Sequence, residues 1–121
     1  MQQVVRAFPV LKGREVEMGQ FLNELRGAKK SETDAFYKRY GVARETAYLQ
    51  KTDGGTILIV VTDIDDAAKA FSDYGASKAD FEAWFKGRVE SFSGINLDKA
   101  PRGPEAERLH DWSRSGIPLE K

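Results

Sequence analysis

Residues 56–62 (TILIVVT) constrain the fold more than any other part of this sequence. Every side chain from residue 57 to residue 61 is apolar, so a strand formed here is apolar on both of its faces. A strand of this kind is buried on both faces and therefore lies in the centre of its sheet. Just before it, Asp53 and Gly54 belong to a typical tight-turn sequence, Thr-Asp-Gly-Gly. Residues 44–51 alternate as a half-buried strand does. The sequence therefore predicts a β-hairpin whose second strand is central.

Helical periodicity flanks this hairpin on both sides, each time in two segments. Before the hairpin, an apolar stripe lies at helical spacing, and a second short helix is expected between a cap at Ser31 and a stop at Gly41. After the hairpin, one helix begins at the acidic run 63–66 and ends at Gly75, and another continues through Phe92. The first stripe consists of Met18, Phe21, Leu22 and Leu25.

Two further strands are expected at the ends of this pattern, over residues 4–10 and 107–112. The resulting order, β-α-β-β-α-β, is the ferredoxin-like split pattern of an α+β fold. Right-handed crossovers place the first and third strands in the centre of an antiparallel sheet, with the helices on one face. We expect one domain over residues 1–112, followed by a C-terminal tail at residues 113–121.

The composition excludes several classes of protein. There is no cysteine, and the single histidine, His110, is too few for a multi-histidine metal site. The 19 Lys and Arg residues balance 19 Asp and Glu residues, which argues against binding to nucleic acid. No apolar segment is long enough for a membrane span, and the N-terminus does not resemble a signal peptide. We therefore expect a cytoplasmic protein with no cofactor, no metal and no membrane contact.

The three acids of the run 63–66 have two interpretations. Asp63, Asp65 and Asp66 would cap the following helix, or they would bind a divalent cation. Capping is favoured, because a site for a hard cation needs more converging oxygens than this run supplies.

The open face of the predicted sheet is the reason to expect a second copy of the chain. Helices on one side leave the other face bare, and one set of side chains in residues 57–61 makes that face apolar. The small apolar sets are expected beneath the helices: Val5, Ala7 and Pro9 in the first strand, and Ala47 and Leu49 in the second. The larger side chains left for the open face are Arg6, Phe8, Tyr48, His110 and Trp112. Packing this face against its counterpart in an identical chain gives a homodimer, and a net charge of zero permits the approach.

These five side chains are also the candidate ligand-binding residues, and His110, Arg6 and Tyr48 are the catalytic candidates. His110 suits a general base because its ordinary pKa lies near neutrality, although a hydrogen bond at the dimer interface is the structural alternative. Arg6 suits a clamp on a carboxylate or enolate oxygen, or an ion pair within the sheet. Tyr48 and Trp112 suit the walls of an aromatic site or the core of an interface, and Phe8 shares their face.

The strand order, the Arg6-x-Phe8 first strand and the ending His110-Asp111-Trp112 resemble the dimeric α+β barrel superfamily. More narrowly, they resemble a branch of small bacterial proteins within it. The resemblance covers residues 3–112, and it implies a ferredoxin-like fold and a homodimer. Members of the superfamily include cofactor-independent monooxygenases, haem-degrading enzymes, small isomerases and stress-induced proteins. No motif selects one of these at the level of residues, so no catalytic residue is carried over.

Three functions remain open at this point. The first is a homodimer that binds a small molecule in a cavity between sheet and helices. The second is a cofactor-independent monooxygenase or isomerase for an aromatic or enolisable substrate, with His110 as base and Arg6 as anion stabiliser. The third is a stress-response or interaction module without catalysis. The enzyme requires His110, Arg6 and Tyr48 to converge on a cavity of roughly 300 Å³ or more.

Overall fold

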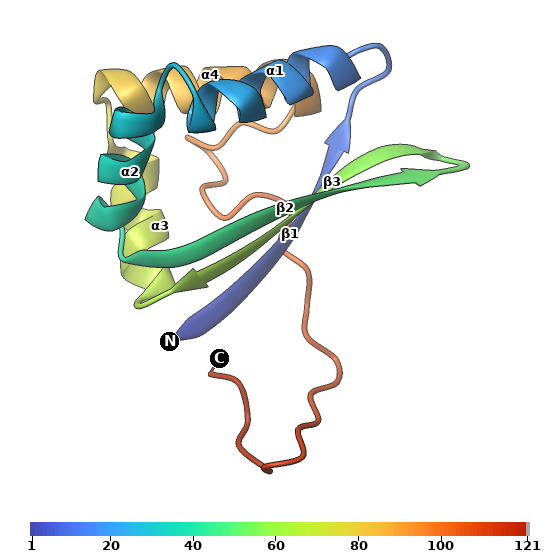
Figure 1. The fold of residues 1–121 in the computed structure, drawn as a ribbon, viewed down its shortest axis with the longest axis vertical. Coiled ribbons are helices and arrows are strands. Elements are labelled where there is room, and N and C mark those ends of the chain that lie inside the picture. Colours follow the sequence, from blue (N-terminus) through green and yellow to red (C-terminus); the bar gives the residue numbers. More distant parts are fainter. Residues whose placement is uncertain (121) are drawn as a thin grey trace.

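A three-stranded sheet and four helices make up the regular structure in the computed structural model, which describes residues 1–120. Figure 1 shows their arrangement, with all four helices on one side of the sheet. In chain order the elements are β1 (Gln2–Val10), α1 (Glu15–Arg26), α2 (Lys30–Arg39), β2 (Val42–Thr52), β3 (Gly55–Ile64), α3 (Ala67–Ala76) and α4 (Asp80–Ser93). The chain is therefore α+β, and each helical connection has two segments, as predicted.

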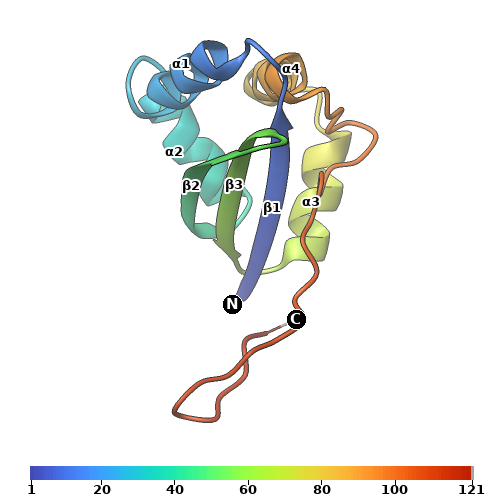
Figure 2. The ribbon, with the colours of Figure 1, turned by 90° about the vertical axis from the view of Figure 1, so that its right-hand side faces the viewer.

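The sheet has the order β1-β3-β2, and both pairs of strands are antiparallel. The central position of β3 confirms the prediction made from its doubly apolar sequence. Thr52 pairs with Gly55 across the two-residue turn at Asp53 and Gly54, so the predicted hairpin is also confirmed. Figure 2 shows the three strands side by side, with β3 between the other two.

The fourth strand expected at residues 107–112 is not formed, so the full ferredoxin-like order is not shown. The chain around residues 104–106 pairs briefly with β1: Ala7 N–H donates to the Pro104 carbonyl at 3.0 Å and Ala106 N–H donates to the Val5 carbonyl at 2.8 Å. Farther along the described chain, Glu120 forms one isolated bridge with Gln2 of β1. Both alternating sets of residues 107–112 are mostly polar or charged, so pairing would bury little apolar surface. We call the largely exposed segment 107–120 the C-terminal arm, and Figure 2 shows it projecting away from the sheet.

The faces of β1 are the reverse of the prediction. Val4, Arg6, Phe8 and Val10 are buried beneath the helices, whereas Ala7 and Pro9 on the other face are exposed. The space between a sheet and a helical layer must be filled at high density, and large side chains fill it better than small ones. The assignment of β2 was correct, because Ala47 pairs with Val60 on the covered face and Tyr48 pairs with Ile59 on the open face.

The sequence predicted the N-terminal cap of α3 correctly and that of α2 incorrectly. Asp66 caps α3 as expected, because its carboxylate accepts the Lys69 N–H at 3.1 Å. Ser31 does not cap α2, which begins one residue earlier. The Lys29 N–H donates to the Glu24 carbonyl and the Lys30 N–H to the Gly27 carbonyl, so a tight turn joins the helices directly. This turn leaves no extended residue at position 31 to act as a cap.

Aromatic side chains fill most of the space between the helices and the sheet. Phe36 contacts the rings of Tyr74, Phe81 and Phe85 with centroids 5.1–5.7 Å apart. Trp84 packs at 5.5 Å from Phe21 at the outer side of this core. Such aromatic pairs add to the stabilisation from apolar burial. Within residues 1–120, no helix is long and apolar enough to cross a membrane.

Candidate functional site

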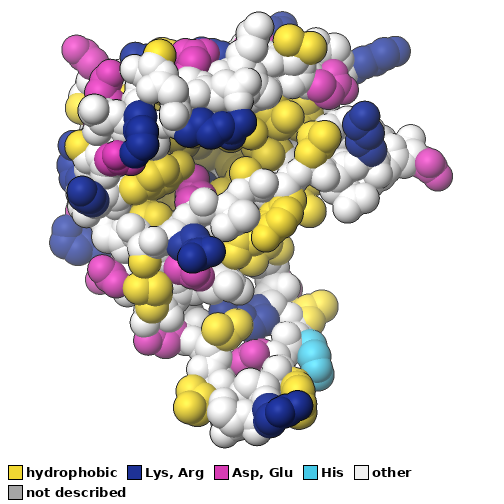
Figure 3. All heavy atoms as spheres, in the orientation of Figure 1, with side chains coloured by type: hydrophobic (Ala, Val, Ile, Leu, Met, Phe, Trp, Pro, Cys, Tyr) yellow, Lys and Arg dark blue, Asp and Glu magenta, His cyan; other side chains and the backbone are white. Residues whose placement is uncertain are grey.

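The aromatic core is incomplete at one place, where a cavity of about 360 Å³ lies between the covered face of the sheet and helices α1, α2 and α4. Figure 3 shows it as a hollow between the helical layer and the β-hairpin, with hydrophobic walls and basic side chains at its edge. The rings of Phe8, Phe21, Phe85 and Phe92 form much of its lining. The sheet contributes the aliphatic side chains Leu58 and Val60. The cavity therefore suits a molecule with an apolar body.

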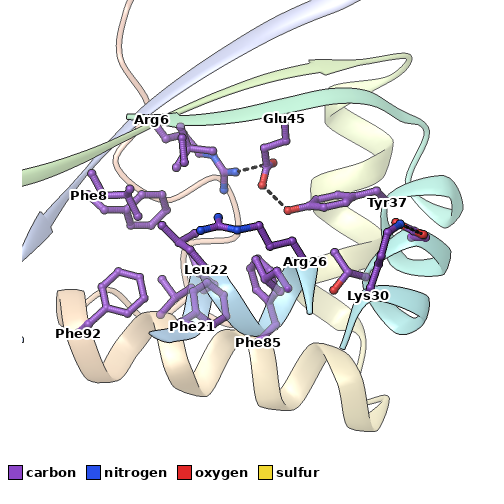
Figure 4. A pocket seen from close by; sticks show the side chains of 18 residues that line it. Arg6, Phe8, Phe21, Leu22, Arg26, Lys30, Tyr37, Glu45, Phe85 and Phe92 are labelled. Atoms are coloured by element: carbon purple, nitrogen blue, oxygen red, sulfur yellow. Dashed lines mark hydrogen bonds and ion pairs between the residues drawn. The ribbon is translucent and has the colours of Figure 1, made fainter. Parts of the chain in front are cut away.

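A connected group of polar side chains forms one end of this cavity, as Figure 4 shows. Glu45 of β2 accepts hydrogen bonds from the Tyr37 hydroxyl at 2.6 Å and the Thr62 hydroxyl at 2.8 Å. Its carboxylate also lies 3.5 Å from Nη2 of Arg6 on β1. The sheet register places Arg6 beside Val60 and Glu45 beside Thr62, so both side chains rise from the covered face.

Arg6 is a buried cation with few hydrogen bonds. Its residue is only 8 % exposed, and its Nε has no hydrogen-bond partner among the described residues. A guanidinium carries five N–H donors, and here the one ion-pair contact is long. The rings of Phe8 and Phe71 lie 5.4 and 5.2 Å from its Cζ, which stabilises the positive charge without using the donors. Arg6 therefore has donors to offer to an acceptor in the cavity.

Two buried tyrosines remain protonated beside this group. Burial raises the pKa of Tyr37 far above its ordinary value, and the neighbouring Glu45 carboxylate raises it further. Burial also raises the pKa of Tyr74, whose hydroxyl has no hydrogen-bond partner among the described residues. Arg6, Tyr37 and Tyr74 share a second void of about 40 Å³. Neither hydroxyl is therefore a base at neutral pH: Tyr37 donates its proton to Glu45, and the Tyr74 hydroxyl keeps an unused donor.

Charged side chains from α1 and α2 lie at the mouth of the cavity. Lys30 forms an ion pair with Asp34 at 2.8 Å, and Arg26 donates to the neutral amide oxygen of Asn23. Together with Arg6 and Glu45, the cavity is lined by three cations and two carboxylates. It therefore carries one positive charge in excess. Its described lining holds neither histidine nor serine, and its one threonine, Thr33 of α2, donates its hydroxyl to the Lys29 carbonyl at 2.8 Å.

The structure brings together only two of the five predicted site residues. Arg6 and Phe8 line the cavity. Tyr48 is 56 % exposed on the opposite face of the sheet, and Trp112 is 76 % exposed on the C-terminal arm. His110, also on the arm, borders a separate surface hollow beside Gln3 and Val5. The set of His110, Arg6 and Tyr48 that the enzyme requires is therefore not assembled within one chain.

The sequence analysis missed the other polar residues of the lining, which are Glu45, Tyr37, Arg26, Lys30, Thr33 and Asp34. Glu45 could have been found, because it shares its alternating position on the strand with Ala47 and Leu49, which were expected beneath the helices. A carboxylate on a buried face needs a cation, and Arg6 of β1 supplies it from across the central strand β3.

No group of three or more His, Asp or Glu side chains in the described part of the chain is placed to hold a metal ion. Comparisons with protein-family models, with curated proteins and with solved structures gave no match to this chain. The resemblance to dimeric α+β barrel proteins therefore stays a prediction.

Proposed function

We propose that this protein binds a small organic molecule in the cavity between the sheet and the helices. The observation that carries the proposal is a cavity of about 360 Å³ with aromatic walls and a buried, incompletely hydrogen-bonded Arg6 at its end. This volume lies within the range of ligand pockets, and the combination of apolar walls with a few convergent polar groups is typical of them.

A core that served stability alone would close this space. Protein interiors are packed at the density of organic crystals, and buried charges are costly unless they are fully paired. Here the space stays open, and Arg6 meets its carboxylate at 3.5 Å. Both features favour a protein that binds a ligand in its interior over an interaction module that uses only its surface.

The proposal includes a homodimer formed through the open face of the sheet. The register places Ala7, Ile59 and Tyr48 side by side on this face, and no helix covers it. Ile57 and Val61 extend the apolar surface along β3, and neither is fully buried. Because the chain has no net charge, two copies can approach with these faces in contact. This arrangement would be the α+β barrel that the sequence resembles.

A blocked cavity tests the binding proposal. Ala47 lines the cavity and is exposed at its edge, so Ala47→Trp places a large ring in the entrance. We expect 2-naphthoate or 2-naphthalenemethanol to bind the native protein saturably, with one site per chain, in a calorimetric titration. Ala47→Trp should abolish this binding.

The matched control is Ala35→Trp, at an exposed position of α2 outside the lining of the cavity. It should bind as the native protein does. Binding that survives Ala47→Trp unchanged, or the failure of both probes to bind, would show that the cavity is not a binding site.

The dimer is tested by its mass in solution. Light scattering should give twice the chain mass of 13.5 kDa, and Ile59→Lys should give the mass of one chain, because a charge in the centre of the face opposes its burial. Ala35→Lys, on the helical surface, should leave the dimer intact. A native mass of one chain at every concentration would contradict this part of the proposal.

A further inference from the structure

We infer that the ligand of the cavity is a monocarboxylate with an aromatic or similarly apolar body, and that Arg6 holds its carboxylate. This inference rests on the proposed binding function and adds the chemical class of the ligand. It depends on three features: the unused donors of Arg6, the state of Glu45 and the charge balance of the lining.

The first feature is the position and hydrogen bonding of Arg6. Its side chain is nine-tenths buried and lines the cavity, so a ligand oxygen can reach it only from inside. Its Nε has no partner, and its ion pair uses Nη2 at 3.5 Å. A planar guanidinium presents its N–H groups side by side, so one with a free Nε and a single long ion-pair contact keeps the capacity to bind the two oxygens of a carboxylate.

The second feature is that Glu45 does not depend on Arg6 alone. The Tyr37 and Thr62 hydroxyls donate to its two carboxylate oxygens at 2.6 and 2.8 Å, which is closer than the 3.5 Å to Arg6. These two hydrogen bonds stabilise the carboxylate when Arg6 turns toward a ligand. The loose pair therefore lets Arg6 accept a second anion without leaving the first one unpaired.

The third feature is the charge of the lining. Arg6 offsets Glu45 and Lys30 offsets Asp34, which leaves the charge of Arg26 at the mouth. A single negative charge on the ligand balances this excess, whereas a cation would be repelled and a dianion would leave one negative charge unbalanced. Arg26 would attract the anion at the entrance, and Arg6 would fix it inside.

The remaining walls determine the body of the ligand. The phenylalanine rings that line the cavity offer faces and edges to another ring, and they present no further hydrogen-bond donor. The carboxylate must therefore be confined to one end of the molecule. An aryl monocarboxylate meets all of these conditions.

Three naphthalene probes of similar shape test the ligand class by calorimetric titration: 2-naphthoate, 2-naphthalenemethanol and 2-naphthylmethylamine. We expect the carboxylate to bind about tenfold or more tightly than the alcohol, because hydrogen bonds to a charged group are stronger than neutral ones. The amine should bind most weakly. Equal affinities, or tighter binding of the alcohol or the amine, would overturn the ligand class while leaving a binding cavity in place.

Two variants test whether Arg6 and Arg26 cause the preference for 2-naphthoate over the alcohol. Arg6→Gln combined with Glu45→Gln removes both charges, so the advantage of 2-naphthoate over the alcohol should disappear while the alcohol still binds. Arg26→Gln, at an exposed position, should weaken 2-naphthoate roughly two- to fivefold and leave the alcohol unchanged. A preference for the carboxylate that persists in both variants would overturn the role of the arginines.

A spectroscopic measurement on the native protein does not depend on the folding of the double variant. The Arg6 Nε–H resonance should shift when 2-naphthoate binds and should stay in place with the alcohol. If 2-naphthoate binds without shifting this resonance, Arg6 does not hold the carboxylate. If no probe binds, or Ala47→Trp does not block binding, the proposed function itself fails.

Discussion

Two buried cations, Lys86 and Arg6, lie in different parts of this molecule and differ in how fully their N–H donors are hydrogen-bonded. Lys86 of α4 is 5 % exposed and Arg6 of β1 is 8 % exposed, so both charges are removed from water to a similar degree. The Lys86 ammonium donates to the Ser77 carbonyl at 3.1 Å, the Gly75 carbonyl at 3.4 Å and the Asp98 carboxylate at 2.8 Å. Its three donors therefore have three acceptors.

Arg6 has more donors than Lys86 and fewer partners. Its five N–H groups face one carboxylate at 3.5 Å, and its Nε has none among the described residues. The difference separates a structural charge from one that is available. Lys86 joins the end of α3 to the loop that follows α4, whereas Arg6 leaves its hydrogen-bonding capacity open toward a cavity.

The largest expected effect on stability comes from the fully bonded cation. Lys86→Met leaves two carbonyl groups without their donor and separates Asp98 from its partner, and we expect a loss of about 3 kcal/mol in the free energy of unfolding. Urea denaturation measures it. Lys78→Met is the matched control, because Lys78 contacts the same carboxylate at 3.5 Å from an exposed position, and it should cost less than about 0.5 kcal/mol.

Arg6→Met should destabilise the protein by less than Lys86→Met, about 1–2 kcal/mol in the same assay. The reason is that Glu45 keeps the hydrogen bonds from Tyr37 and Thr62. A loss equal to or greater than that of Lys86→Met would contradict the comparison, because it would make Arg6 the more important structural charge.

The smallest effect concerns the dependence of stability on pH. The hydrogen bond from Lys86 is the main reason that the pKa of Asp98 lies below its ordinary value of 3.8. A carboxylate with a lowered pKa in the folded state stabilises the protein above its unfolded pKa, and this contribution is lost as the pH falls through the folded value. Asp98→Asn should therefore be less stable than the native protein near neutral pH, with a gap that narrows below about pH 4.

Urea midpoints measured between about pH 6 and pH 2 follow this gap. Asp53→Asn, in the exposed hairpin turn, is the matched control and should show a smaller gap throughout. A gap for Asp98→Asn that stays constant with pH would show that the Lys86 contact is not coupled to the charge of Asp98.

The sequence predicted the hairpin, the central strand and the paired helical segments because each depends on a local pattern. The run at residues 56–62 leaves no polar face, and Asp53-Gly54 sets the turn that precedes it. A cavity between sheet and helices was also expected, and Arg6 and Phe8 line it.

The remaining features depend on relations between segments that are distant in sequence. Alternation divides the residues of β1 into two sets, but only the acid on β2 that meets Arg6 shows which set faces the helices. Likewise, residues 107–112 form a strand only if pairing with a neighbouring strand buries apolar surface, and within the described residues 1–120 they pair with no strand. Glu45, Tyr37 and Arg6 come from three different elements, so their convergence had no local signal.

The two tryptophans of this chain report on two different places. Trp112 on the C-terminal arm is surrounded by solvent, whereas Trp84 packs against Phe21, whose ring also lines the cavity, and against the Lys29 ammonium at 4.6 Å. Replacing Trp112 with Phe would leave one indole as the only tryptophan fluorophore. Because Phe21 both contacts this indole and lines the cavity, the emission of the indole would report the occupancy of the cavity that the proposed binding function requires, without an added label.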